Sequence, residues 1–418
     1  MRDFAALLRD RRFVLLWLAM LASATGTFAL LVAVSAHVLR SSGSGLAAAA
    51  VFASQWLLPV VLAPWVRRVC ETRDLRRAVV VCELLSAATS IGVAVFLHAD
   101  SLVAVLLCFA VRGLFEAMTK TARVVFVRVM FEGPQLAAAS YTFNLSYYAG
   151  ITLGGLAASL LTTTVPLEII CVIDALTFVI SAACYALLPR VHTSASGKAT
   201  RGVWRDAWAI LSRNKPLLAS VGYLVIATGC FQGFHNAART LLPIRHLGFT
   251  DAVAMRLQGV SGTAIVCGAL AAPLLAGLAR YRVFAHAAFA LACAAMMATA
   301  FVRTPMQLFA AYFVFMFLFE LSFTVGEANL IQAAAADEIA TLSVASSSTG
   351  TAMLVLTALL TGALADAIAF QWVCMIVACV ALGLAMALWL LQRPTRSTRV
   401  PGAATAVVGG IATARSAE

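Results

Sequence analysis

The chain has 418 residues, of which 62% are hydrophobic and 11% are charged, and its formal net charge is +12. So few charges exclude an ordinary soluble globular domain, in which about a quarter of the residues are charged, and favour a polytopic membrane protein. The basic excess is then explained by loop position and by contact with anionic lipid, so no nucleic-acid partner needs to be invoked.

Apolar runs follow one another along almost the whole chain. A hydrocarbon core roughly 30 Å thick needs about 20 apolar residues per helix. We predict an all-α membrane protein with twelve spans, at residues 13–38, 45–66, 78–98, 101–122, 141–163, 167–188, 217–241, 252–279, 284–302, 306–327, 342–365 and 371–391. The first run is too long for the apolar region of a signal peptide and lacks a small-residue cleavage site behind it, so we expect it to be a mature helix.

The basic residues predict the orientation of these spans. The N-terminus, the tail from residue 393 and every second gap, at 67–77, 120–128, 190–215 and 280–282, hold 24 of the 30 Lys and Arg residues. Basic loops stay on the cytoplasmic side of a membrane. We therefore expect both termini to be cytoplasmic and the protein to be a multi-pass component of a bacterial-type inner membrane.

The span order predicts two similar halves. A bundle at 1–189 and a bundle at 217–392 are separated by a cytoplasmic linker at 190–216 and followed by a disordered tail at 393–418. Ala63-Pro64 recurs as Ala272-Pro273, and Gly154-Gly155-Leu156-Ala157 is echoed by Gly362-Ala363-Leu364-Ala365 at nearly the same displacement. Parallel repeats of this kind are typical of secondary transporters.

Trp204 and Trp208, with basic residues around them, indicate an amphipathic helix on the inner leaflet near the end of the linker.

Other classes of protein lack support in the sequence. There is no Walker sequence, which argues against ATP-driven transport, and no Ser/His/Asp constellation or metal-ligand spacing that would indicate an enzyme. All of the ten cysteines except Cys70 lie inside predicted spans without a CxxC pair, so we interpret them as packing residues. We expect no cofactor, no metal and a monomeric chain whose partners are membrane lipids, protons and a small molecule.

Several short stretches, in this order and spacing, resemble the major facilitator superfamily over residues 10–392. They are Arg73-Asp74-Leu75-Arg76-Arg77 leading into Cys82-Glu83-Leu84-Leu85; Thr121-Ala122-Arg123 to Ala137-Ala138-Ala139-Ser140; Ile173-Asp174-Ala175-Leu176-Thr177-Phe178; and Asn329-Leu330-Ile331-Gln332. Within the superfamily the sequence is most similar to the drug-efflux branch that includes macrolide and siderophore exporters. The resemblance implies two pseudo-symmetric six-helix halves, with the first, fourth, seventh and tenth spans lining a central cavity.

The loop between the second and third spans departs from the family pattern. The family usually has a glycine and, four residues later, an acidic residue that helps to latch the cytoplasmic gate, where this chain has Arg68 and Thr72. Residues that could form a replacement latch are Glu71, Asp74, Arg76 and Arg77.

Charges inside spans are costly, so we expect them to face protein or a water-filled cavity. Arg112 and Glu116 are four residues apart and are predicted to pair on one helical face, with Glu116 as a proton carrier that Arg112 modulates. Glu320 in the tenth span is the competing carrier, because a lone carboxylate in an apolar wall can take up and release a proton. For the Arg112–Glu116 pair, a purely structural role is the alternative.

A polar stripe on the seventh span predicts cavity-lining residues. Gln232, His235, Asn236 and Arg239 follow helical spacing and would lie on one face. Tyr147 and Asn144 on the fifth span are further candidates for substrate contact. No acidic residue lies within one helical turn of Arg239, which leaves its charge available to an anionic ligand.

These features together predict a proton-coupled exporter, an antiporter, that moves a small organic molecule by alternating access. An anionic metabolite such as a carboxylate siderophore fits the cavity charges best, and an amphipathic drug, which would make this a multidrug-resistance protein, is the other cargo considered. Two alternatives remain: a proton symporter that imports an anionic nutrient, and a transport-inactive sensor or lipid-handling protein on the same fold.

Overall fold

The computed structural model describes residues 9–62, 65–66, 74–131, 133–162, 164–191, 203–275, 282–333 and 338–392. Apart from short connections, the regular elements within these ranges are helices. The first half contains α2 (Arg11–Ser42), α3 (Gly45–Val61), α5 (Leu75–His98), α6 (Leu102–Met130), α7 (Gly133–Leu161) and α8 (Leu167–Ala186). The second contains α10 (Lys215–Ile226), η1 (Ala227–Gln232), α11 (Gly233–Leu241), η2 (Leu242–His246), α12 (Asp251–Leu274), α14 (Arg282–Ala298), η3 (Thr299–Phe301), α15 (Pro305–Ala333), α16 (Ile339–Ala367) and α17 (Phe370–Gln392).

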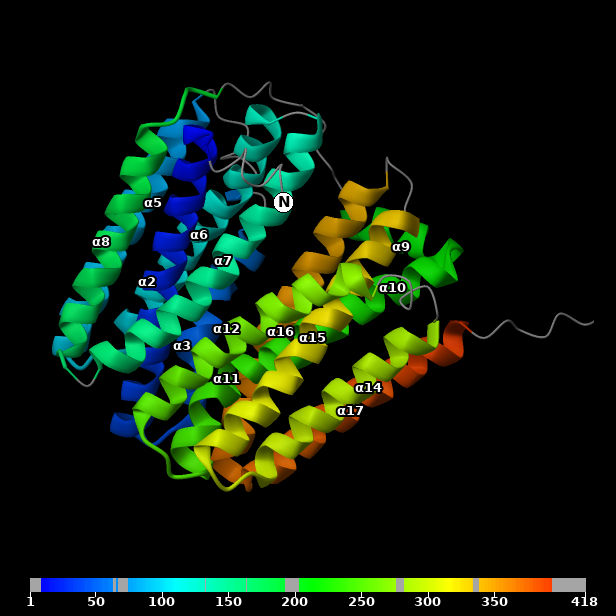
Figure 1. Ribbon diagram of the computed structural model, residues 1–418. Helices are drawn as coiled ribbons and strands as arrows, with labels where there is room; N and C mark the ends of the chain where they lie inside the picture. Colours follow the sequence, from blue (N-terminus) through cyan, green and yellow to red (C-terminus); the bar gives the residue numbers. More distant parts are fainter. Residues whose placement is uncertain are drawn as a thin grey trace, which may run out of the picture.

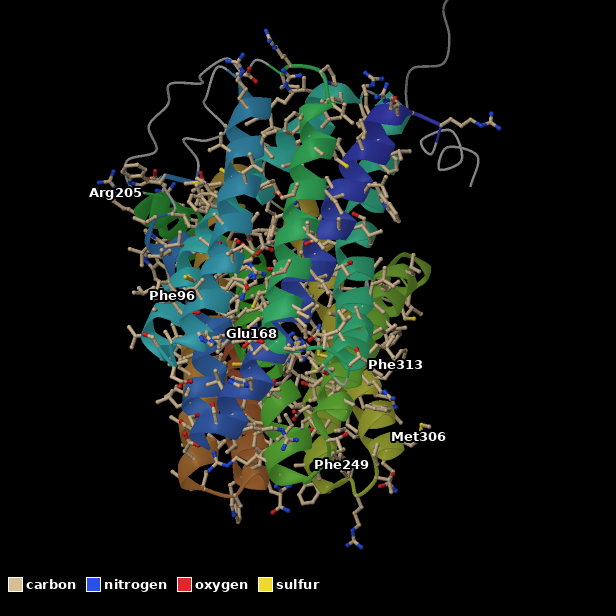
Figure 2. All side chains as sticks on the ribbon, turned by 90° about the vertical axis from the view of Figure 1, so that its left-hand side faces the viewer. Phe96, Glu168, Arg205, Phe249, Met306 and Phe313 are labelled. Carbon is tan, nitrogen blue, oxygen red and sulfur yellow. The ribbon has the colours of Figure 1, made fainter. Side chains whose placement is uncertain are left out.

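Each predicted span corresponds to one of these helices, with α10, η1, α11 and η2 together forming the seventh. In the described part of the chain, nine helical segments are long and apolar enough to cross a membrane, and α3 and α14 are shorter apolar helices. With α7, which has 29 residues, this is the twelve-helix membrane fold in two six-helix halves. Large apolar side chains such as Leu176 and Val95 are exposed on the outside of the bundle, as expected where helices face lipid. In Figure 2 the labelled Phe96 and Phe313 lie on this outer surface.

Local sequence explains where the first helix begins and ends. The carboxylate of Asp10 accepts a hydrogen bond of 2.8 Å from the backbone N–H of Arg12, which caps the start of α2. At the other end Gly43 adopts a left-handed conformation with φ of 66°, which favours glycine and stops the helix. Between these signals the chain builds 32 residues of helix, several more than the apolar run alone predicts.

The two halves contact each other at one end and diverge at the other (Figure 1). We call the end at which α2 and α5 begin the linker end, because α9 (Val203–Arg213) also lies there. At the opposite end, here called the floor, α3 packs against α16 and α7 packs against α12. Helix α9 packs its Ala207 and Leu211 on the second half and leaves Trp204 and Trp208 exposed.

Glycines allow the halves to approach closely at the floor. A Cβ atom on Gly155 of α7 would lie 2.5 Å from the backbone nitrogen of Gly259 in α12. A Cβ atom on Gly362 of α16 would lie 2.7 Å from the carbonyl oxygen of Gly45 in α3. Real Cβ atoms do not approach backbone atoms so closely, so both contacts depend on small residues.

Hydrogen bonds and ion pairs also join the two halves at the floor. Asp366 of α16 accepts hydrogen bonds from the backbone N–H groups of Gly45 and Leu46, at 2.6 and 3.0 Å, and from the hydroxyl of Ser44 at 3.0 Å. Arg245 pairs with the same carboxylate from within its own half. Ion pairing between Arg40 and Asp251 joins the two halves a second time.

Candidate functional site

A cavity of about 480 Å³ lies between the two halves. Its lining extends from Arg239 and Gln258 near the floor to Lys120 and Glu327, which are exposed toward the linker end. Side chains of α2, α3, α6 and α7 line it from the first half, and side chains of α10, η1, α11, α12, α15 and α16 line it from the second. A volume in this range is typical of sites for small organic molecules.

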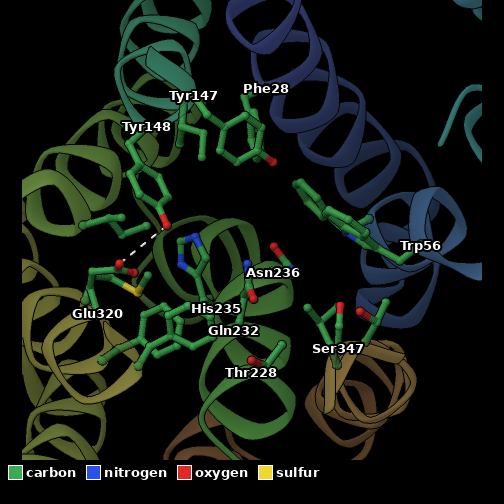
Figure 3. A pocket seen from close by; sticks show the side chains of 18 of the residues that line it. Phe28, Trp56, Tyr147, Tyr148, Thr228, Gln232, His235, Asn236, Glu320 and Ser347 are labelled. Atoms are coloured by element: carbon green, nitrogen blue, oxygen red, sulfur yellow. Dashed lines mark hydrogen bonds between the residues drawn. The ribbon is translucent and has the colours of Figure 1, made fainter. Parts of the chain in front are cut away.

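The seventh span forms a polar wall of this cavity. Thr228, Gln232, His235 and Asn236 lie along it in Figure 3, where they face side chains of the first half. His235 is held in place by a hydrogen bond between its Nδ1 atom and the hydroxyl of Tyr312, 2.9 Å away. The turns of η1 are π-helical, which shifts the spacing of residues from that of a regular α-helix and is frequent at functional sites.

Arg239 lies at the floor of the cavity and has only 1% of its surface exposed. The guanidinium carbon lies 3.7 Å from the centroid of the Phe52 ring and 5.9 Å from that of Phe28, both in the first half. Its Nη1 atom donates a hydrogen bond to Oε1 of Gln258. Among the described residues no carboxylate pairs with Arg239, and its Nε and Nη2 atoms are buried without a hydrogen-bond partner. The charge is therefore stabilised by aromatic faces and one amide rather than by an acid.

Glu320 of α15 is the more deeply buried of the two carboxylates that line the cavity among the described residues, the other being Glu327. It is 4% exposed, and its Oε1 atom accepts hydrogen bonds from the hydroxyls of Thr324, at 3.1 Å, and Tyr148, at 3.5 Å. Figure 3 shows the contact with Tyr148, which crosses from one half to the other. Within the described part of the chain, Glu320 forms no ion pair. Its side-chain partners are these two hydroxyl groups.

The predicted pair of Arg112 and Glu116 does not form. Arg112 is completely buried inside the first half, where its Nη1 atom lies 2.9 Å from Oδ2 of Asp174 in α8. Glu116 instead accepts a hydrogen bond of 2.6 Å from Nε2 of Gln55 in α3. Neither Arg112 nor Glu116 lines the cavity. Although the two residues are one helical turn apart, Arg112 pairs with Asp174 of α8, which is buried at the same depth.

The candidate gate residues that can be placed form contacts within the first half. Asp74 caps α5 by accepting a hydrogen bond of 3.2 Å from the backbone N–H of Arg77, and its carboxylate pairs with the Arg77 side chain. Arg76 donates a hydrogen bond of 3.0 Å to the carbonyl oxygen of Leu188 after α8. Glu71 lies outside the described residues. In this conformation the Asp74 contacts stabilise the start of α5, the Arg76 contact joins α5 to the segment after α8, and none of them joins the two halves.

Of the remaining cavity candidates, Tyr147 lines the site, whereas Asn144 belongs to α7 but its side chain lies outside the described part of the structure. The sequence did not identify Trp56, Gln258 and Lys120, which also line the cavity. Gln258 had a usable signal, since it is a polar residue within an apolar span. Trp56 had none, because an aromatic residue in a membrane helix is equally typical of a lipid-facing position.

A comparison of the sequence with models of protein families agrees with this architecture. The Major Facilitator Superfamily model matches residues 16–341, which is more than half of the chain. No curated protein sequence matches the chain.

Solved structures resemble the chain in fold at low sequence identity. A mutant of the nucleoside transporter NupG is 15% identical, with a TM-score of 0.74 over 91% of this chain and 100% of that one. A bacterial homolog of the human lysosomal transporter Spinster, in an inward-facing and unoccupied conformation, is 12% identical, with a TM-score of 0.72 over 92% of this chain and 97% of that one. A POT family transporter in complex with 5-aminolevulinic acid is 11% identical, with a TM-score of 0.71 over 91% and 96%. The twelve-helix fold, the cavity between its halves and the family match together identify the chain as a member of the major facilitator superfamily and thus as a membrane transporter.

Proposed function

We propose that this transporter exports a small organic anion in exchange for protons, by alternating access of the central cavity to the two sides of the membrane. The distribution of basic residues supports a cytoplasmic position for the linker end. The conformation described above is then the one in which the cavity opens to the cytoplasm and the floor is closed. A carboxylate siderophore or another acidic metabolite belongs to the class of cargo proposed, and an amphipathic drug is the alternative.

The observation that carries the proposal is the uncompensated charge of Arg239. A buried cation without an acidic partner is costly in an apolar environment, and an anion in the adjacent cavity would reduce that cost. The aromatic rings that cover Arg239 belong to the first half, whereas Arg239 belongs to the second. Separation of the halves at the floor would therefore uncover the guanidinium and allow direct hydrogen bonds with the anion. The contact between the anion and Arg239 would therefore be stronger in the conformation in which the floor is open.

Arg239→Gln is expected to weaken binding of an acidic substrate and leave the folded protein intact. Hydrogen bonds to a charged group contribute about 1.5–3 kcal/mol, which corresponds to a loss of affinity of roughly 10- to 150-fold. The loss should be measured as uptake of acidic compounds into proteoliposomes, with folded protein quantified by size-exclusion chromatography.

A suitable control is Arg256→Gln, because Arg256 lies on α12, two residues before the Gln258 that contacts Arg239, but is exposed. Normal transport of every anion by the Arg239 variant, or a cationic substrate, would contradict the anionic cargo and leave the drug-like alternative.

Protons are proposed to bind at Glu320. Its carboxylate lies at the cavity wall among hydroxyl groups and contacts Tyr148 of the opposite half, so a change in its charge would alter a contact between the halves. Glu116 was the other candidate carrier, and its hydrogen bond to Gln55 within one half gives it no such contact. Glu320→Gln is expected to abolish the stimulation of transport by a pH gradient, because glutamine keeps the size and hydrogen bonding of the side chain but cannot bind a proton.

The measurement is substrate flux with and without an imposed pH gradient, with Glu116→Gln as the matched variant. An unchanged response in the Glu320 variant, together with a lost response in the Glu116 variant, would move the proton site to α6. The sign of the flux decides direction: accumulation of substrate on the side of higher proton concentration indicates exchange, and movement of both in the same direction indicates the symport alternative.

A further inference from the structure

The first half of the molecule lines the cavity with aromatic side chains that the polar stripe of the seventh span faces. The rings of Phe28 and Tyr147 meet edge to face, with centroids 5.9 Å apart, and the rings of Tyr147 and Tyr148 are also 5.9 Å apart. Trp56 of α3 also lines the cavity, at a position separate from these three rings (Figure 3). We use "aromatic surface" for Phe28, Trp56, Tyr147 and Tyr148 together.

Neighbouring groups constrain the orientation of the Phe28, Tyr147 and Tyr148 rings. Tyr147 lies between Phe28 and Tyr148, and the Nζ atom of Lys120 lies 5.2 Å from its ring centroid. Tyr148 is further restrained by its hydrogen bond to Glu320. A ring system that is fixed in this way can bind a flat partner with little additional loss of side-chain entropy. A flexible aliphatic molecule would gain only the free energy of burying its apolar area against such a surface, without the additional energy of aromatic pairing.

The opposite wall offers groups of different chemistry. Gln232 and Asn236 present amide groups, each of which can donate and accept hydrogen bonds, and Arg239 provides a positive charge at the floor. A molecule that satisfies both walls has an unsaturated face for the aromatic surface and an edge of hydrogen-bonding atoms, with its negative charge directed toward the floor.

From this division of the cavity we infer that the cargo is a planar aromatic carboxylate. The inference rests on the proposed anionic cargo and narrows its chemical class. Its ring system lies against the aromatic surface, its polar substituents contact Gln232 and Asn236, and its carboxylate is directed at Arg239. A cavity of about 480 Å³ accommodates a molecule of one or two fused rings together with its substituents.

Binding of three compounds to the purified full-length chain in nanodiscs tests this inference. 2-Naphthoate is planar and anionic, decahydro-2-naphthoate has the same charge and carbon skeleton but no aromatic ring, and 2-naphthamide is planar but neutral. Aromatic stacking adds enough to predict that 2-naphthoate binds roughly three- to tenfold more tightly than the saturated acid. Isothermal titration calorimetry would give the three affinities directly.

Two substitutions separate the contribution of the ring from general effects on folding. Trp56→Leu should remove most of the preference for the planar acid, whereas Trp56→Phe should retain it. As a control we choose Trp372→Leu, because Trp372 is 56% exposed on the outer surface of α17 and should leave the preference unchanged. All variants should be compared for thermal stability in the same nanodiscs.

The outcomes distinguish failure of the inference from failure of the proposed function. Equal binding of the two acids, with no effect of Trp56→Leu, would overturn the aromatic class and leave an anionic cargo. Equal binding of 2-naphthoate and 2-naphthamide, with no effect of Arg239→Gln, would overturn the anionic cargo itself. Binding of none of the three by a folded preparation would also overturn the aromatic class, and transport by the Arg239 variant would then decide the anionic proposal.

Discussion

Replacement of Gly155 by leucine is expected to oppose closure of the floor and thereby to slow the transport cycle. A side chain at this position would meet the backbone of Gly259 in the other half, and backbone atoms cannot move aside as a side chain can. Overpacking typically costs about 1–3 kcal/mol. Here that cost falls on one conformation only, so the ratio of floor-open to floor-closed molecules should rise by roughly 5- to 150-fold.

A cysteine at the floor reports this shift. Ser35 is 1% exposed, and its hydroxyl donates a hydrogen bond of 3.3 Å to Thr240 of the other half. Ser35→Cys should be protected from a membrane-impermeant maleimide in the parent and should react when Gly155→Leu is added. Gly383→Leu is the control, because a Cβ atom at Gly383 meets nothing within 4 Å. A protected cysteine and normal transport in the Gly155 variant would show that the floor tolerates the side chain.

Breaking the ion pair between Arg112 and Asp174 is expected to cost about 3–5 kcal/mol of stability, because one charge would remain buried without its partner. Asp174 is 1% exposed and also accepts a hydrogen bond of 2.7 Å from the hydroxyl of Ser90, so Asp174→Asn should sharply lower the yield of folded protein. The measurement is the unfolding midpoint in detergent together with the amount of monodisperse protein.

The double variant Arg112→Met with Asp174→Leu distinguishes a structural role from a role in coupling. Apolar replacement of both partners is often neutral or stabilising, so folding should recover. Because neither residue lines the cavity, proton-coupled transport should recover as well. A folded double variant that no longer responds to a pH gradient would return Arg112 to the coupling mechanism.

The sequence predicted the helices and their order well, because each span needs only one apolar run of sufficient length to exclude backbone polar groups from lipid. Helical spacing placed Gln232, His235 and Asn236 on one polar stripe. It could not predict the π-helical turns of η1, since these depend on how the seventh span packs against its neighbours and leave little trace in local composition.

Side-chain partners were harder to predict than helices. Spacing along α6 suggested that Arg112 pairs with Glu116, but the structure places Asp174, 62 positions away in the chain, beside Arg112. A helical residue has neighbours on its own helix and on every helix that packs against it, and only the first set can be read from spacing. For Arg239 the prediction from the sequence agrees with the structure. No acidic residue lies near it in the sequence and none pairs with it among the described residues, where aromatic rings from the other half cover the charge.

The contact of Asp366 with the start of α3 links helix stability to the transport cycle. The first N–H groups of a helix normally find acceptors in the residues just before it, and Ser44 does serve the N–H of Ala47. The N–H groups of Gly45 and Leu46 instead use a carboxylate that is more than three hundred residues away and belongs to the other half. Loss of a helix cap costs about 0.5–2 kcal/mol. Each opening of the floor must therefore uncap α3, so the stability of a single helical turn contributes to the free-energy difference between the two access states.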